Sequence, residues 1–143
     1  AKCSVTTFES TPNKGLAVLD LTDVYTDHVR QAKRTFEMVD RQHVVITDEI
    51  QTKSPSELYW FMHTNAEIAP NGATAILTQN GKQLTAEILS PSGATFTSMD
   101  AKPLPTSPVP KQADNKKRRK LTIHLRDVTN LTIQVKLTPL GNE

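Results

Sequence analysis

Apolar and polar side chains alternate in one segment after another of this sequence, and this alternation restricts the fold more than any other feature. Side chains on a β-strand point alternately to the two faces of a sheet, whereas a helix repeats every 3.6 residues. The 19 threonines agree, because β-branched residues pack well on a pleated surface. The segments that we predict to be strands are residues 30–39, 43–51, 58–63, 121–125 and 131–137, together with two strands within residues 76–88.

Turn signals predict how these strands connect. Asn80-Gly81 lies between alternating runs, which is typical of a tight hairpin, because both turn residues accept a positive φ. Residues 127–130 are expected to form the turn between the last two strands. Helix is scarce: residues 22–28 predict one short turn, with Thr22 or Asp23 as its cap.

Together these strands predict an all-β fold, an antiparallel β-sandwich of about nine strands with little helix. The length of 143 residues suits a single domain over residues 1–143. The strand at 58–63 is apolar on both faces, so we expect it to be central in its sheet. Residues 100–120 break the alternation with four prolines and a run of basic residues, and we expect a Pro-rich, basic loop there.

Composition excludes several classes of protein. The formal net charge of +2 is too small to indicate a nucleic-acid partner, and no apolar run approaches the roughly 20 residues that a membrane span needs. Cys3 is the single cysteine, so no intrachain disulfide is expected, which fits the cytosol as well as a large periplasmic or secreted protein. The sequence opens at Ala1 without a signal peptide pattern, and we expect a chain cut from something longer.

The titratable residues show no catalytic or metal-binding motif. None of the histidines has a second His, Cys or carboxylate at a ligand spacing, so we assign no metal ligand, no cofactor and no catalytic residue. These histidines are His28, His43, His63 and His124.

Asp48 and Glu49 lie on opposite faces of a strand and cannot form an acid–base pair. An inward-facing Asp48 needs donors, and Arg34 interrupts the apolar face of the preceding strand. We therefore predict a structural Arg34–Asp48 ion pair in preference to a catalytic role for Asp48. Trp60 is flanked by apolar residues and is predicted to be buried between two sheets.

Five adjacent basic residues could contact an anionic glycan: Lys116, Lys117, Arg118, Arg119 and Lys120. The alternative is a solvated loop, because runs of like charge are often disordered or solvated. The run contains no aromatic residue, which argues further against single-stranded nucleic acid. Both interpretations of the run stay open at this point.

Four segments resemble the heparinase II/III-like polysaccharide lyases. In that family one strand ends in Asp-Leu-Thr and a Tyr, an Arg-bearing strand follows, and then an apolar strand ends in Asp-Glu. The similar segments here are Ser10–Tyr25, Ala32–Met38, Val44–Ile50 and Tyr59–Thr64.

The resemblance implies that the chain is the C-terminal β-sandwich region of such a lyase, with the N-terminal toroid domain of the same parent chain as its partner. It also implies a parent that cleaves acidic polysaccharide by β-elimination and is periplasmic or secreted. No catalytic or metal residue carries over. Tyr25 and His63 have the right chemistry for an acid and a base, but they match structural strand positions in the family pattern.

Two other functions compete with this interpretation. An independent carbohydrate-binding or adhesion module would show a row of exposed aromatic residues, whereas aromatic residues make up only 5% of this chain. A stand-alone enzyme would need an acid–base cluster, which the sequence lacks. A large exposed apolar patch would favour the lyase domain, because it would mark the surface of contact with the rest of the parent.

Overall fold

The computed structural model describes residues 3–100 and 119–140, and it confirms the all-β, antiparallel prediction. The described residues form nine strands and one short 3-10 helix, η1 (Thr22–Val24). The strands are β1 (Ser4–Thr11), β2 (Lys14–Asp20), β3 (Val29–Val39), β4 (His43–Thr64), β5 (Glu67–Asn71), β6 (Thr74–Gln79), β7 (Lys82–Ser90), β8 (Thr97–Asp100) and β9 (Arg119–Leu140).

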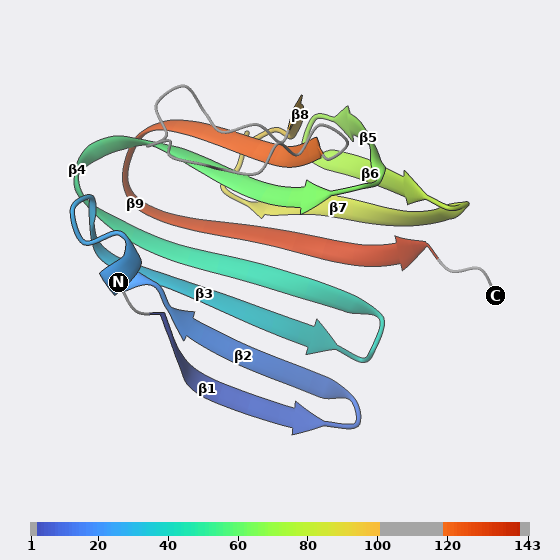
Figure 1. Cartoon of the computed structure of the whole chain (residues 1–143), viewed down its shortest axis with the longest axis horizontal. Coiled ribbons are helices and arrows are strands. Elements are labelled where there is room, and N and C mark those ends of the chain that lie inside the picture. Colours follow the sequence, from blue (N-terminus) through green and yellow to red (C-terminus); the bar gives the residue numbers. More distant parts are fainter. Residues whose placement is uncertain (1–2, 101–118, 141–143) are drawn as a thin grey trace, which may run out of the picture.

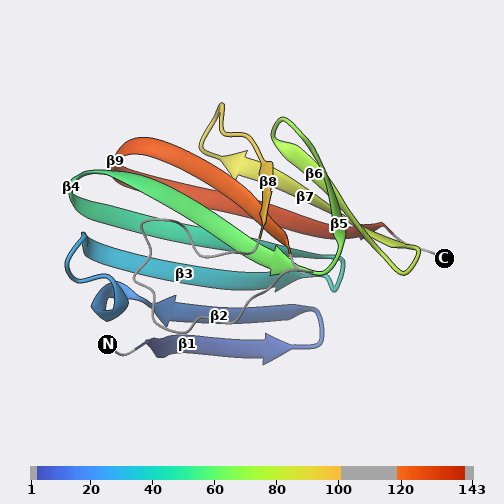
Figure 2. The same ribbon diagram turned by 45° about the horizontal axis from the view of Figure 1, so that its top comes forward.

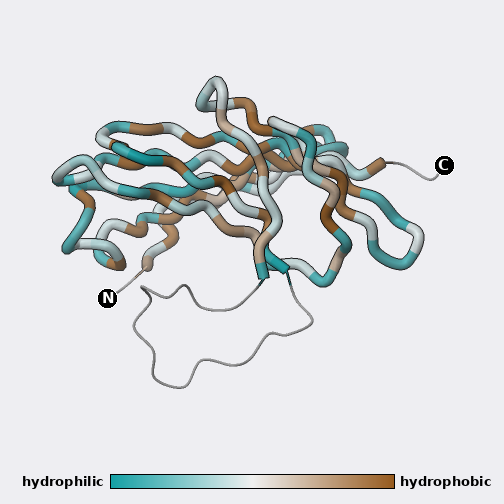
Figure 3. Tube along the Cα trace, turned by 90° about the horizontal axis from the view of Figure 1, so that it is seen from above, coloured by the Kyte–Doolittle hydropathy of each residue, from teal (hydrophilic) through white to brown (hydrophobic). Residues whose placement is uncertain are grey.

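All nine strands belong to one antiparallel sheet in the order β1-β2-β3-β4-β9-β7-β6-β5, with β8 paired to β9 (Figure 1). The hairpin between β6 and β7 is the predicted one, since Asn80 and Gly81 both have positive φ (53° and 76°). Polar and apolar positions alternate along the strands, as Figure 3 shows.

β4 and β9 are 22 residues long, and each contains two segments that we had predicted as separate strands. Their pairing shifts register between Gln51 and Leu58, opposite the region where Asp127 adopts a φ of 54°. The predicted turn at 127–130 was therefore wrong: this irregularity bends the ribbon without reversing it, because both halves of β9 remain paired with β4.

The bend turns one sheet into two layers, as Figures 1 and 2 show. The upper layer consists of the second half of β4 (residues 56–64), the first half of β9 (residues 119–125) and β8. It covers part of the lower layer, namely the first half of β4, the second half of β9 and the strands β7 and β6. The sandwich thus arises from a folded sheet.

The core between the layers contains side chains from both. Trp60 is 4% exposed, which confirms its predicted burial, and its ring lies 6.4 Å from that of Phe96. The buried apolar cluster comprises Ile46, Trp60, Ala66, Ala75, Leu77, Ala86, Ile88, Ala94, Phe96, Leu121, Ile123, Ile133 and Val135.

The strand segment that carries Trp60 is not central. Within the described residues, β3 pairs with β4 only as far as Thr52, and residues 56–64 pair on one side alone, with β9. The apolar outer positions Tyr59 and Phe61 stack on each other at 5.5 Å, so mutual packing replaces the second covering sheet that we expected.

The predicted helical turn over residues 22–28 exists only over Thr22–Val24, and its cap differs from the prediction. Its N-cap is Leu21, and no side chain caps it, so neither Thr22 nor Asp23 has the predicted role. The Thr22 N–H instead donates to the Asp20 carboxylate at 3.0 Å, because Asp20 lies just before the turn with its side chain turned back toward it.

Among the described residues, the structure contains no helix that is both long and apolar enough to cross a bilayer.

Candidate functional site

The inner face of the lower layer continues beyond the part that the upper layer covers. One row of directly paired residues runs across five strands as Phe8, Ala17, Phe36, Ile46 and Val135. Val135 is 0% exposed and Ile46 is 7% exposed, but Phe8 at the far end is 73% exposed. The same apolar face therefore passes from buried to open as it crosses the sheet.

The open part is formed by β1, β2 and β3. Val5 and Met38 lie in neighbouring rows of this face and are also exposed. We call this region, with Val5, Phe8, Leu19, Phe36 and Met38, the uncovered face. Exposed contiguous apolar patches of this kind mark interaction surfaces.

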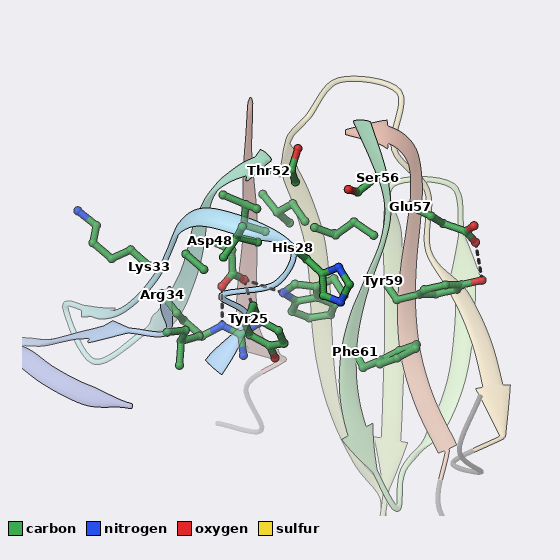
Figure 4. Close-up of a pocket in the computed structure, with 17 residues that line it drawn as sticks. Tyr25, His28, Lys33, Arg34, Asp48, Thr52, Ser56, Glu57, Tyr59 and Phe61 are labelled. Carbon is green, nitrogen blue, oxygen red and sulfur yellow. Dashed lines mark hydrogen bonds and ion pairs between the residues drawn. The ribbon is translucent and has the colours of Figure 1, made fainter. Parts of the chain in front are cut away.

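A pocket of about 480 Å³ lies at the step where the upper layer ends (Figure 4). Three segments far apart in sequence meet there: the η1 region with Tyr25 and His28, the strands β3 and β4, and the edge of the upper layer with Tyr59 and Phe61. Its volume lies within the usual range for small-molecule sites, about 300–1,000 Å³.

Arg34 and Asp48 form the inner wall of this pocket and confirm the predicted ion pair. Arg34 Nε donates to Asp48 Oδ1 at 2.6 Å, and Nη2 donates to Oδ2 at 3.0 Å. Trp60 Nε1 donates to the same Oδ2 at 3.0 Å. Asp48 is only 5% exposed, so three donors satisfy a carboxylate that would otherwise be buried without partners.

Glu57 organises the outer face of the upper layer beside the pocket, where its side chain and that of Tyr59 point away from Tyr25 and His28 (Figure 4). Tyr59 Oη donates to Glu57 Oε1 at 2.9 Å, and His124 Nε2 contacts the same oxygen. The rings of Tyr59 and His124 stack in parallel with their centroids 4.2 Å apart. The hydrogen bond from Tyr59 is the main reason that the pKa of Glu57 is below its ordinary value, and the same bond raises the pKa of Tyr59.

The structure places the histidines at separate positions. His28 lines the pocket, His124 stacks on Tyr59, and His63 is exposed on the outer face of the upper layer. Tyr25 and His63 are not brought together, because only Tyr25 lines the pocket. Within residues 3–100 and 119–140, no group of three or more His, Cys, Asp or Glu could hold a metal ion.

Most of the predicted basic loop lies outside the described residues, because residues 101–118 are not described. Lys116, Lys117 and Arg118 belong to this range. Asp100 belongs to β8, and Arg119 and Lys120 belong to β9, so the strands extend into the predicted loop. Arg119 donates to Asp100 at 2.9 Å.

Lys120 is buried, and its Nζ lies 4.2 Å from the centroid of the Phe61 ring. Burial lowers the pKa of this lysine. Arg119 and Lys120 thus both have partners within the fold.

Comparison with known proteins gives similarity in structure without similarity in sequence. No family model matches the chain, and no curated protein matches it. Among solved structures, the heparan sulfate lyase HepC from Pedobacter heparinus superposes with a TM-score of 0.76 at 11% identity and covers 99% of this chain. A heparinase III gene product superposes at 0.66 with 16% identity over 97% of this chain, and another heparinase III structure at 0.66 with 13% identity over 96%.

The chain therefore has the β fold of one part of the heparinase-type lyases, in agreement with the resemblance in its motifs. At 10–16% identity this likeness concerns the fold. The chain spans about a fifth of the length of these structures, 22% of HepC and 21–22% of the heparinase III chains.

Proposed function

We propose that this chain is a non-catalytic β domain of a larger polysaccharide lyase, whose uncovered face packs against the N-terminal toroid domain of the same parent chain. The observation that carries the proposal is the row from Val135 to Phe8, which changes from buried to exposed without losing its apolar character. Exposing a face of this kind to water is unfavourable in free energy, because its apolar area stays hydrated. A second domain packed on it would bury that area.

The parent would cleave acidic polysaccharide by β-elimination. A base removes the proton next to the uronate carboxylate, the glycosidic oxygen leaves from the neighbouring carbon with a proton from an acid, and a double bond forms between the two carbons. A lyase acting outside the cytoplasm would meet such polymers, so we place the parent in the periplasm or among secreted proteins.

The titratable groups of the pocket support a non-catalytic role for this domain. The carboxylate of Glu57 accepts from Tyr59 and His124, and its lowered pKa makes it a weaker base. The raised pKa of Tyr59 makes its phenolate harder to form at neutral pH. Asp48 is fully engaged by Arg34 and Trp60.

Two measurements test the two parts of this proposal. The purified chain, incubated with heparin, heparan sulfate or alginate, should give no rise in ultraviolet absorbance from unsaturated uronate; a sustained rise would overturn the non-catalytic role. The complete reading frame should encode a helical toroid region before this segment. Its absence would overturn the proposal that the parent is a polysaccharide lyase.

A second candidate is an independent carbohydrate-binding module, and one observation favours it. Tyr59, Phe61 and His63 form an aromatic row on the outer face of the upper layer, with centroid spacings of 5.5 and 6.5 Å. Sugar rings stack on such rows. Binding of the isolated chain to neutral oligosaccharides, abolished by Tyr59→Ala, would favour this module; equal binding by the variant would exclude the row.

A further inference from the structure

The guanidinium of Arg34 has one edge fixed by the protein and another edge available to a ligand. Nε and one Nη2 hydrogen are used by Asp48. The hydrogens on Nη1 have no hydrogen-bond partner among residues 3–100 and 119–140. Arg34 lines the pocket with 30% of its side chain exposed, so the available edge is accessible from the pocket side.

This edge is held in place before any ligand arrives. Asp48 is buried and is itself fixed by Trp60 Nε1, which belongs to the core. A chain of two hydrogen-bonded contacts thus connects the guanidinium to the buried core. A planar donor pair that loses little freedom on binding recognises a carboxylate or sulfate well.

The remaining polar groups of the pocket are mainly donors. The two carboxylates of its lining, Asp48 and Glu57, already accept from three and two donors, respectively. Tyr25 and His28 are exposed at the pocket, and neither side chain has a hydrogen-bond partner within the described residues. Lys33 points away, as Figure 4 shows, because it pairs with Glu49 at 3.1 Å.

We propose that the pocket binds the anionic group, carboxylate or sulfate, of an acidic saccharide. The free edge of Arg34 takes the anion, and Tyr25 and His28 donate further hydrogen bonds. The anion site rests on the geometry of Arg34 and its neighbours alone. The saccharide rests on the proposed function.

The test is calorimetric titration of the chain as it exists with four probes at low ionic strength. Heparosan tetrasaccharide carries carboxylates without sulfate, and a keratan sulfate oligosaccharide carries sulfate without uronate. Chitotetraose carries neither anion, and polyglutamate offers carboxylates on a peptide. We expect binding of one or both acidic saccharides, with the stronger of the two identifying the anion, and no binding of chitotetraose.

Variants assign the binding to the pocket. His28→Ala should weaken it about fivefold, and Tyr25→Phe about threefold, as expected for the loss of one hydrogen bond of ordinary net strength. His63→Ala is the matched control, because His63 is an exposed histidine outside the pocket, and it should leave affinity unchanged. Arg34→Lys keeps the charge but loses the planar edge, and it should abolish binding while thermal melts report whether the fold survives.

Equal affinity of His28→Ala, Tyr25→Phe and the unchanged chain for the acidic saccharides would overturn the pocket as the site, as would chitotetraose binding as tightly as heparosan. Polyglutamate binding more tightly than either saccharide would overturn the saccharide and favour a peptide from a partner. Each result is independent of the proposed parent, which the reading frame tests separately.

Discussion

The two halves of one sheet face show how little the alternating pattern alone decides about burial. Around Ile46 and Val135 the face is sealed by the upper layer, whereas around Phe8 the same face, in the same register row, lies open. The difference is made by where β4 and β9 bend, because the returning strands reach over β7 and β6, and no other strand of the described residues covers β1, β2 and β3. Whether an apolar residue of this face is buried therefore depends on whether the upper layer lies over it.

The largest expected difference in the free energy of unfolding is between two aromatic truncations. Trp60→Ala should lower the free energy of unfolding by about 3–5 kcal/mol, because it opens a cavity in the covered half. Phe8→Ala should cost less than about 1 kcal/mol, because that ring is already in water. Denaturant melts measure both. Similar losses for the two variants would show that the uncovered face is covered in solution.

A smaller difference in stability is expected between variants of two adjacent carboxylates on opposite faces of β4. Asp48→Asn should cost about 2–3 kcal/mol, because it leaves the partly buried Arg34 with a poorer partner. Glu49→Gln removes only an exposed pair with Lys33 and should cost less than about 0.5 kcal/mol. Thermal melts of the two variants at one pH and salt concentration provide the comparison; a larger loss from Glu49→Gln would contradict it.

Acidification should weaken the contacts that Glu57 makes on the outer face of the upper layer. The folded-state pKa of Glu57 lies below its ordinary value of 4.5, so its contribution to stability is present above that pH and is lost as the pH falls toward the folded-state pKa. The melting temperature of the unchanged chain should therefore drop more between neutral pH and pH values below 4.5 than that of Glu57→Gln. Parallel pH profiles would exclude this linkage.

The smallest expected effect on stability is that of Phe8→Ser, which should nevertheless change the fluorescence of a bound dye. The uncovered face should bind a hydrophobic fluorescent dye, and Phe8→Ser should reduce the fluorescence with little change in melting temperature. Ile76→Ser changes an exposed apolar residue outside this face and serves as the control. Equal dye fluorescence for the unchanged chain and Phe8→Ser would show that the dye binds elsewhere.

Period-two alternation predicted the strands and the core, since Trp60, Ile46 and Val135 sit where a buried face requires them. It could not predict that β4 and β9 continue through their bends, because the decisive features are a positive φ at Asp127 and pairing between segments about 70 residues apart. Turn residues and bend residues look alike in a sequence.

The candidate site was predictable only in part. Arg34 and Asp48 could be paired because each interrupts an apolar face on adjacent strands. The Trp60 hydrogen bond, Tyr59 and His28 could not be placed, because the pocket joins segments whose proximity depends on the bend of β4. No local spacing motif connects these positions.

β1 also has a consequence for how the chain behaves at high concentration. It is the terminal strand of the sheet order among the described residues, all eight of its positions are exposed, and Glu9 is its single charged residue. A strand of this kind presents a row of unsatisfied N–H and C=O groups, which is a template for addition of a further strand from another copy. The isolated chain should therefore self-associate edge to edge as its concentration rises, whereas a neighbouring domain laid along β1 would keep it monomeric.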